Sequence, residues 1–304
     1  MTELSAFPSV SAVARYIEVT FPAMRTVVDR GYGDFGLPWA ERLEETLRTL
    51  LPSDPALHKA VDGYIDFSLD ALRLHRRFEK ERVYQKKSYA EAAAAVYDNA
   101  NYMNDLYLPG ILLSHFLWPH HYRQRLFFES SVLADMKRAG ARQFFDVGVG
   151  SGYYSRLALS AIPELMGRGF DVSKSSRDYA LWQVGAFGAS ARYEVQLGDI
   201  TALDPAPQTD WLFSVEVLEH LEDPVTFLRG LRRLLAPTGK AFITAALNAP
   251  NEDHIYLYRN VAEVMEQLQQ SGFAVEQFHS CFAYKPKRID DPVPEIAAFV
   301  AVPM

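Results

Sequence analysis

The hydrophobic pattern divides the chain into two parts with different periods. From about residue 10 to residue 128, apolar side chains recur every three or four positions, as Leu43, Leu47 and Leu50 do. This is the period of an amphipathic helix. Breakers such as Pro109–Gly110 interrupt the pattern at short intervals. The first part is therefore expected to be an all-helical cap made of several helices.

After Phe144, short apolar runs alternate with amphipathic helical segments. This alternation is typical of a mostly parallel sheet with helices on both faces. Seven strands are expected, at Gln143–Val147, Met166–Asp171, Ala191–Gln196, Trp211–Val215, Lys240–Ala245, Phe273–His279 and Ile296–Val302. The predicted fold class is α/β, with a helical cap or substrate domain over residues 1–128 and a second domain over residues 129–304.

A glycine-rich turn directly follows the first expected strand. It contains Gly148, Gly150 and Gly152 and leads into a helix that begins at Tyr153. Glycine allows the backbone to approach a ligand closely. A dinucleotide-binding turn would have its third glycine at position 153, so Tyr153 argues against a nicotinamide dehydrogenase. Taken alone, the turn fits a ligand site or a plain strand-to-helix connection.

Polar side chains follow the next three expected strands. Asp171 ends the second strand, where an acidic residue accepts hydrogen bonds from both hydroxyls of a ribose. Asp199 follows the third strand, where a carboxylate would face an adenine amino group. Ser214 and Glu216 lie at the end of the fourth. Since the carboxyl ends of parallel strands meet at one edge of a sheet, these positions are expected to form one crevice.

From about Ala141 onward, these motifs resemble the class I S-adenosylmethionine-dependent methyltransferases. The resemblance is greatest to ubiquinone-biosynthesis-like small-molecule enzymes, whose fourth motif is similar to residues 217–220, Val-Leu-Glu-His. It implies a Rossmann-like sheet with a reversed last strand, and S-adenosyl-L-methionine as the cofactor of residues 129–304. The cofactor-binding residues that it implies are Asp146, Gly148, Gly150, Gly152, Tyr153, Asp171, Val172, Asp199, Ile200, Ser214 and Glu216.

The resemblance implies methyl transfer to a small-molecule acceptor, in biosynthetic or secondary metabolism. Oxygen, nitrogen and carbon acceptors all remain open. One alternative is metal-assisted C-methylation of an α-keto acid. Another is a catalytically silent cofactor-binding protein, which the intact acidic series Asp146, Asp171 and Asp199 disfavours.

The cap contains an aromatic and amide-rich stretch that suits a small organic ligand. Tyr97, Asn101, Tyr102 and His115 are expected to line the acceptor pocket, with Tyr97 and Asn101 on one helical face. A buried packing seam between cap and sheet explains the same residues equally well.

Histidines provide the candidate catalytic bases. His220 follows the fourth expected strand and His254 lies in the loop after the fifth, and Tyr102 is the third candidate. Histidines of the cap, His115, His120 and His121, together with His220 or His254, are also potential iron or zinc ligands. Their spacing matches no metal motif and no cysteine accompanies them, so no metal site is expected.

Composition narrows the possible partners and location. The formal net charge of −7 argues against a broad nucleic-acid-binding face, which needs clustered Lys and Arg. Cys281 is the only cysteine, so no intrachain disulfide can form. No window approaches the roughly 20 apolar residues that a membrane span requires. The chain is expected to be soluble and cytoplasmic, with a small-molecule partner, no nucleic-acid or membrane partner, and a homodimer left open.

Overall fold

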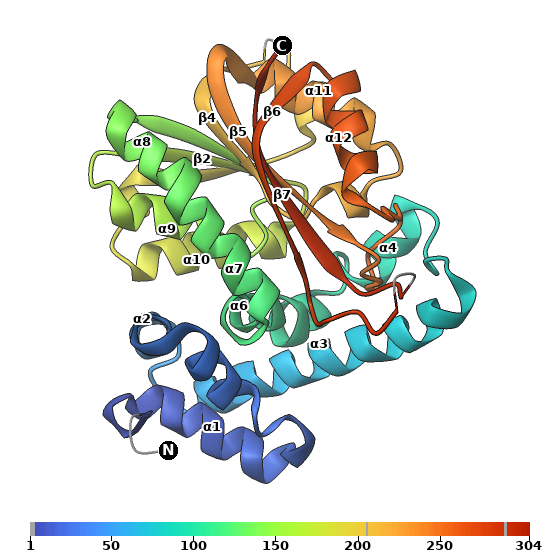
Figure 1. The fold of residues 1–304 in the computed structure, drawn as a ribbon. Coiled ribbons are helices and arrows are strands. Elements are labelled where there is room, and N and C mark those ends of the chain that lie inside the picture. The colour runs from blue at the N-terminus through green and yellow to red at the C-terminus, as the bar shows by residue number, and fades with distance from the viewer. Residues whose placement is uncertain (1–3, 205, 289–290) are drawn as a thin grey trace.

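The computed structural model describes residues 4–204, 206–288 and 291–304, and every regular element before Gln143 in that part is a helix. The α-helices of the cap and the connection to the sheet are α1 (Pro8–Thr20), α2 (Val27–Leu50), α3 (Asp54–Glu81), α4 (Tyr89–Ala95), α5 (Ala100–Tyr102), α6 (Leu108–Leu117), α7 (Pro119–Phe128) and α8 (Ala134–Ala139). Figure 1 shows α3 running beneath the rest of the molecule from α1 and α2 toward α4. Within the described ranges, no helix is both long and apolar enough to cross a membrane.

Two potential helix breakers lie within helical segments of the cap. At Gly36, α2 kinks and continues, with a left-handed φ of 68° at the glycine. The expected break at Pro109–Gly110 is wrong, because α5, a π-helical turn over Met103–Tyr107 and α6 follow one another without interruption. Pro109 lies in the first turn of α6, directly after the wider π turn. Proline is tolerated in a first helical turn, where its missing N–H removes no required hydrogen bond.

All seven predicted strands are present, in the order β3-β2-β1-β4-β5-β7-β6. Their bounds are β1 (Gln143–Val147), β2 (Met166–Asp171), β3 (Tyr193–Leu197), β4 (Thr209–Ser214), β5 (Leu235–Leu247), β6 (Phe273–Phe282) and β7 (Glu295–Pro303). β7 runs antiparallel to both of its neighbours, β5 and β6, and the other pairs are parallel. The expected reversed last strand is therefore confirmed.

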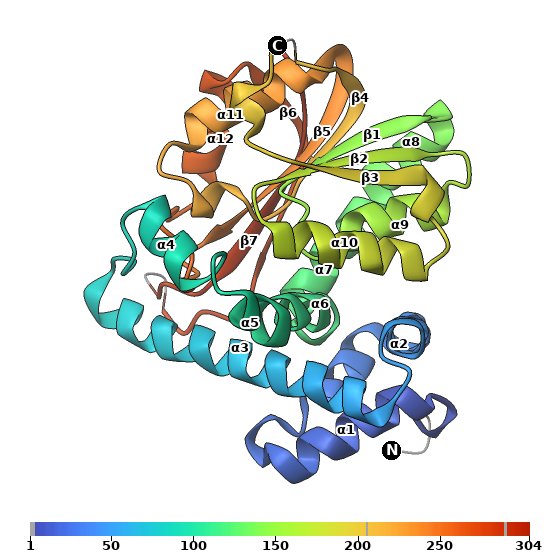
Figure 2. The same cartoon turned by 180° about the vertical axis from the view of Figure 1, so that it is seen from behind.

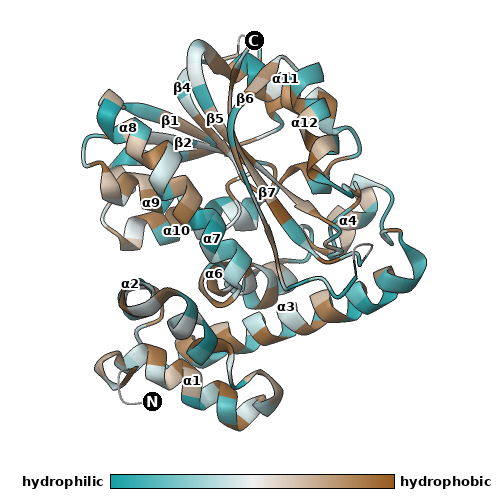
Figure 3. Cartoon of the chain, in the orientation of Figure 1, coloured by the Kyte–Doolittle hydropathy of each residue, from teal (hydrophilic) through white to brown (hydrophobic). Residues whose placement is uncertain are grey.

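Helices cover both faces of the sheet, as Figures 1 and 2 show from opposite sides. α9 (Tyr153–Ala161) and α10 (Lys174–Ala186) pack on one face, and α11 (Pro224–Leu234) and α12 (Val261–Gln270) on the other. Adjacent strand residues alternate between the faces: Phe144 packs toward α9, whereas Phe145 packs toward α11. Brown colouring along the central strands in Figure 3 reflects this burial on both sides. The predicted fold class is confirmed.

The cap shares its hydrophobic core with one face of the sheet. That core runs from Trp39 of α2 and Phe116 of α6 to Tyr153 of α9 and Phe213 of β4. A separate, smaller cluster, called here the satellite core, consists of Phe67, Val96, Met103, Tyr107 and Leu108. The division between residues 128 and 129 stays a prediction, and a π-helical turn joins α7 to α8 across it.

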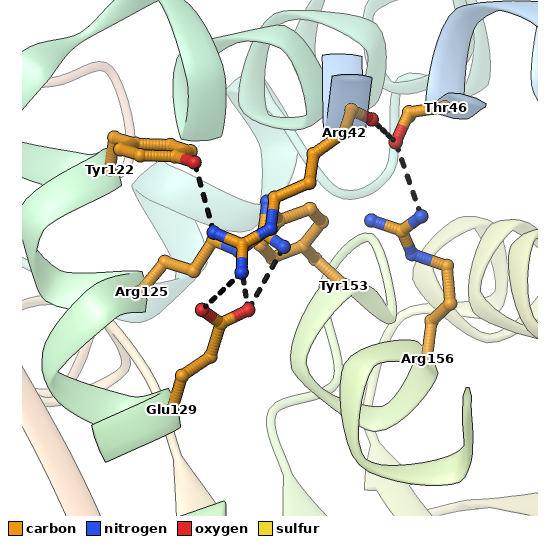
Figure 4. Close-up of polar contacts among 7 residues, drawn as sticks. All are labelled: Arg42, Thr46, Tyr122, Arg125, Glu129, Tyr153 and Arg156. Carbon is orange, nitrogen blue, oxygen red and sulfur yellow. Dashed lines mark hydrogen bonds and ion pairs between the residues drawn. The ribbon is translucent and has the colours of Figure 1, made fainter. Parts of the chain in front are cut away.

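A buried polar network reinforces this junction (Figure 4). Arg125 of α7, only 4% exposed, donates to the Tyr153 hydroxyl at 2.9 Å and pairs with Glu129. Arg42 of α2 pairs with the same carboxylate at 3.2 Å. Arg156 of α9 donates to Thr46 of α2 at 3.2 Å. These contacts fix the start of α9, which directly follows the glycine-rich turn, against two helices of the cap.

Candidate active site

The glycine-rich turn lies where β1 leads into α9. Gly148 and Gly150 have φ angles of 77° and 50°, in the left-handed region that favours glycine. A side chain at Gly148 would collide with Val217, and one at Gly150 would project into open space. Both glycines line a cavity of about 1210 Å³. The turn thus presents bare backbone to a cavity, which allows close approach by a ligand.

Two buried carboxylates lie beside the turn and line the same cavity. Asp146 accepts a hydrogen bond from the Ser155 hydroxyl at 2.6 Å. Asp171 accepts from the backbone N–H groups of Gly150 and Ser173, with N···O distances of 3.3 and 2.7 Å. Burial raises the pKa of Asp146 to about 7 and, against these backbone donors, that of Asp171 to about 6. A carboxylate offers about four acceptor positions, and Asp171 lines the cavity, so a ligand there could also donate to it.

The cavity brings together most of the residues predicted to bind the cofactor. Those that line it are Asp146, Gly148, Gly150, Tyr153, Asp171, Val172, Asp199, Ile200 and Glu216. The described lining does not include Gly152, which faces Ala180 of α10, or Ser214, which is buried in β4. The roles of these two residues remain predictions without a contact to the cavity.

The cap supplies the opposite wall of the cavity. Tyr97 and His115, two of the residues predicted to bind substrate, line it. Further aromatic side chains that the sequence analysis did not select are Phe67, Tyr107 and Trp118. Tyr107 reaches the cavity from the π-helical turn. Such a turn is a backbone irregularity that cannot be recognised from side-chain periodicity.

Asn101 and Tyr102 are placed differently from expectation. Asn101 is exposed, and neither residue belongs to the cavity lining that the described residues form. The expected shared face fails because Tyr97 precedes α5, which begins at Ala100, so Tyr97 and Asn101 do not lie on one helix. Helical spacing relates positions only within a continuous helix.

Asp253 organises a polar cluster between the cap and the sheet. Its carboxylate is fully buried and accepts from the hydroxyls of Tyr97, at 2.9 Å, and Tyr107. It also faces Nδ1 of His220 at 3.2 Å. Burial opposes a charged imidazole, but the Asp253 carboxylate outweighs it and raises the pKa of His220 to about 9. A carboxylate adjacent in sequence to the candidate His254 is the signal that could have identified Asp253.

Two further acidic residues and the second histidine complete the cluster. His254 directs Nδ1 at the Ala249 carbonyl oxygen, 2.5 Å away, and burial lowers its pKa to about 3. Glu216 accepts from the Thr244 hydroxyl at 2.6 Å. Glu219 is fully buried, and no side chain donates a hydrogen bond to either of its carboxylate oxygens. Burial, with mutual repulsion, raises the pKa of Glu216 to about 8.

Comparison with known proteins identifies the class of the sheet-containing part. A sequence family described as "Methyltransferase domain" matches residues 145–241. This region is a class I S-adenosylmethionine-dependent methyltransferase domain. The ubiquinone biosynthesis O-methyltransferase of Xanthomonas axonopodis pv. citri is 31% identical to this chain over 128 residues, 39% of this chain and 48% of that protein. The chain thus spans about half the length of the curated relatives it matches.

Solved structures extend the likeness of fold beyond the methyltransferase domain. The mitomycin 7-O-methyltransferase MmcR aligns with 98% of this chain and 96% of its own at 15% identity, with a TM-score of 0.55. The O-methyltransferase NcsB1 from neocarzinostatin biosynthesis, solved with S-adenosylmethionine and a naphthoic acid, aligns with 85% of this chain and 73% of its own. That match has 18% identity and a TM-score of 0.51. At these identities, the likeness concerns the fold.

Proposed function

We propose that this chain transfers the methyl group of S-adenosylmethionine to an oxygen of a small, mainly aromatic acceptor. The observation that supports this most strongly is a single cavity that joins the glycine-rich turn and Asp171 to an aromatic wall of the cap. An oxygen acceptor is favoured because the curated relatives and the two aligned structures are O-methyltransferases by name. The matches give no support to C-methylation of an α-keto acid or to a silent protein.

The side chains present fit the cofactor. When bound, S-adenosylmethionine supplies a methyl group on a positively charged sulfur. Gly148 and Gly150 would lie against its methionine part, since their backbone is exposed to the cavity. Asp171 lines the cavity, where the two ribose hydroxyls would also donate to it, and Asp199 with Ile200 would face the adenine.

The cap would position the acceptor and exclude water. Methyl transfer is an in-line displacement, so alignment of the reacting atoms supplies much of the rate. Phe67, Tyr107 and Trp118 would hold an aromatic ring, with Tyr97 and His115 near it. Of the three predicted catalytic residues, His220 and His254 line the cavity and Tyr102 does not. His220 and His254 are therefore the predicted catalytic residues in a position to act on the acceptor hydroxyl.

A cavity with an aromatic wall also favours a small molecule over a nucleic acid as acceptor. The homodimer and the cytoplasmic location remain predictions from sequence.

Methyl transfer can be tested with S-adenosylmethionine labelled in the methyl group and matched panels of phenols, amines and α-keto acids. We expect labelled product from the phenol panel only. Mass spectrometry of small molecules retained by the purified protein should detect S-adenosylmethionine or its demethylated product. Labelled amines or keto acids in place of phenols would contradict an oxygen acceptor, and preferred binding of a nicotinamide dinucleotide would contradict the whole proposal.

A further inference from the structure

Three side chains of the kinds that ligate metals meet at the wall of the cavity. Glu219, His220 and His254 each offer one ligand atom, and these atoms all lie within 4.8 Å of one another. Metal–ligand bonds of about 2.0 to 2.2 Å separate neighbouring ligand atoms by about 3 to 4 Å. A small inward adjustment of the side chains would therefore suffice. We propose that Glu219, His220 and His254 bind one divalent transition-metal ion, although the sequence alone gave no reason to expect a metal site.

Both imidazoles have Nδ1 engaged by an oxygen atom of the protein. Nδ1 of His254 faces only a backbone carbonyl oxygen, that of Ala249, so Nδ1 carries the hydrogen. Nδ1 of His220 faces the Asp253 carboxylate at 3.2 Å. Metal binding would displace the additional proton that the Asp253 carboxylate favours on His220, and Nε2 of each neutral ring would then offer its lone pair. Metal-bound histidines characteristically donate their other ring N–H to a carboxylate or a backbone carbonyl, and the structure contains one example of each.

The burial of Glu219 is a separate observation that points to a bound ion. Its side chain is fully buried, and no side chain donates to either carboxylate oxygen; the backbone N–H groups of Glu219 and Ala246 lie near it without good hydrogen-bond geometry. Buried polar groups are nearly always satisfied, and an exception needs an explanation such as an absent ion. Glu216 and Asp253 add further carboxylates close by. A dication would favour the ionised form of the buried Glu219 carboxylate and offset the cost of its burial.

The ligand types indicate which ions the site would accept. Two imidazoles and one carboxylate suit Fe²⁺ or Zn²⁺, whereas Mg²⁺ prefers oxygen ligands only. Three protein ligands leave at least one coordination position, and all three residues line the cavity. An acceptor oxygen could occupy that position, which would lower the pKa of its hydroxyl. This role rests on the proposed function, but the metal site itself does not.

The cap histidines provide a matched control. The sequence analysis considered His115, His120 and His121 as potential ligands, but in the described part of the chain they belong to no cluster of three ligand-type side chains. His121 lines the same cavity and contacts the Ser114 hydroxyl through Nδ1 at 3.2 Å. Replacing it removes a cavity imidazole without touching the proposed ligands.

The test uses the full chain, stripped with chelator and titrated with Fe²⁺ under anaerobic conditions, Zn²⁺ and Mg²⁺. We expect one equivalent of Fe²⁺ or Zn²⁺ to bind, and Mg²⁺ to bind at least tenfold more weakly. Glu219→Gln and His254→Asn should each weaken binding at least tenfold, whereas His121→Asn should not. Bound Co²⁺ should give visible absorption bands typical of nitrogen and oxygen ligands, and these bands should disappear in the two ligand variants.

Binding that is unchanged in both ligand variants, or absent from the stripped wild-type protein, would overturn the proposal. If a variant does not fold, anomalous diffraction from a Zn²⁺-soaked wild-type crystal decides: an ion between the three side chains supports the site, and an ion elsewhere or none contradicts it. Affinity for S-adenosylmethionine is measured in parallel. Metal binding without any methyl transfer would refute the proposed function and leave the metal site standing.

Discussion

Replacement of Asp171 by Asn tests the cofactor assignment, because it removes the charge and changes few atoms. In the wild-type protein the carboxylate accepts from Gly150 and Ser173 and lines the cavity, where the ribose hydroxyls would also donate to it. The substituted amide would keep one oxygen and lose the charge-assisted bonds to the ribose. Hydrogen bonds to charged groups contribute about 1.5 to 3 kcal/mol, so the Kd for S-adenosylmethionine should rise about 10- to 150-fold.

The same residue predicts a pH dependence of wild-type binding. Burial raises the pKa of Asp171 to about 6, so the carboxylate is ionised above that pH and protonated below it. Since the ribose hydroxyls favour the ionised form, affinity should fall as the pH drops below about 6, by at most about tenfold per pH unit. Asp146, with a pKa raised to about 7, is the other carboxyl group that titrates at this site.

Isothermal titration calorimetry between pH 5 and pH 8 measures both effects, with thermal unfolding to verify that the variant is folded. Asp178→Asn is the control, because Asp178 is half-exposed on α10, pairs with Lys174 and does not belong to the described lining. Unchanged affinity in a folded Asp171→Asn protein would refute the assignment. A pH dependence that persists in full in this variant would assign the titration to Asp146 instead.

Two more substitutions test the cap. Tyr153→Phe removes the hydroxyl that accepts a hydrogen bond from the buried Arg125 guanidinium. The free energy of unfolding, measured in urea, should therefore fall by about 1 to 3 kcal/mol. An unchanged free energy would mean that this hydrogen bond makes no net contribution to stability. Asn101→Ala should leave turnover unchanged and stability within about 0.5 kcal/mol, because Asn101 is exposed and outside the described lining. Slower turnover at equal stability would restore Asn101 to the acceptor site.

Strand positions could be predicted from sequence where local signals agree. β1 and β2 have the predicted bounds. β1 ends directly before Gly148 and β2 ends at the acidic Asp171, and each strand pairs in parallel on both sides. β5 was expected to begin at Lys240 but begins at Leu235. Pro237 and Gly239 are typical of a turn, yet Leu235 pairs with Thr209 of β4 across a register shift. Pairing with β4 therefore extends the strand through residues that locally favour a turn.

The residues of the candidate site were likewise predictable from sequence only in part. Residues at strand ends, such as Asp171 and Asp199, were predictable because parallel topology alone brings strand ends to one edge. Contacts between the cap and the loop after β5 were not, since Tyr107 and Asp253 are 146 positions apart and their meeting depends on how the cap packs. No periodicity along the chain contains that information.

The satellite core suggests a route for altering acceptor choice. It contributes Phe67 and Tyr107 to the cavity, while its buried members belong to neither of the cores that hold the sheet and the glycine-rich turn. Redesigning Phe67 of α3 together with the π turn that carries Tyr107 would therefore exchange one aromatic wall for another and leave the glycine-rich turn in place. The acceptor wall and the cofactor-binding edge thus belong to separate packing units, so one can be changed while the other is kept.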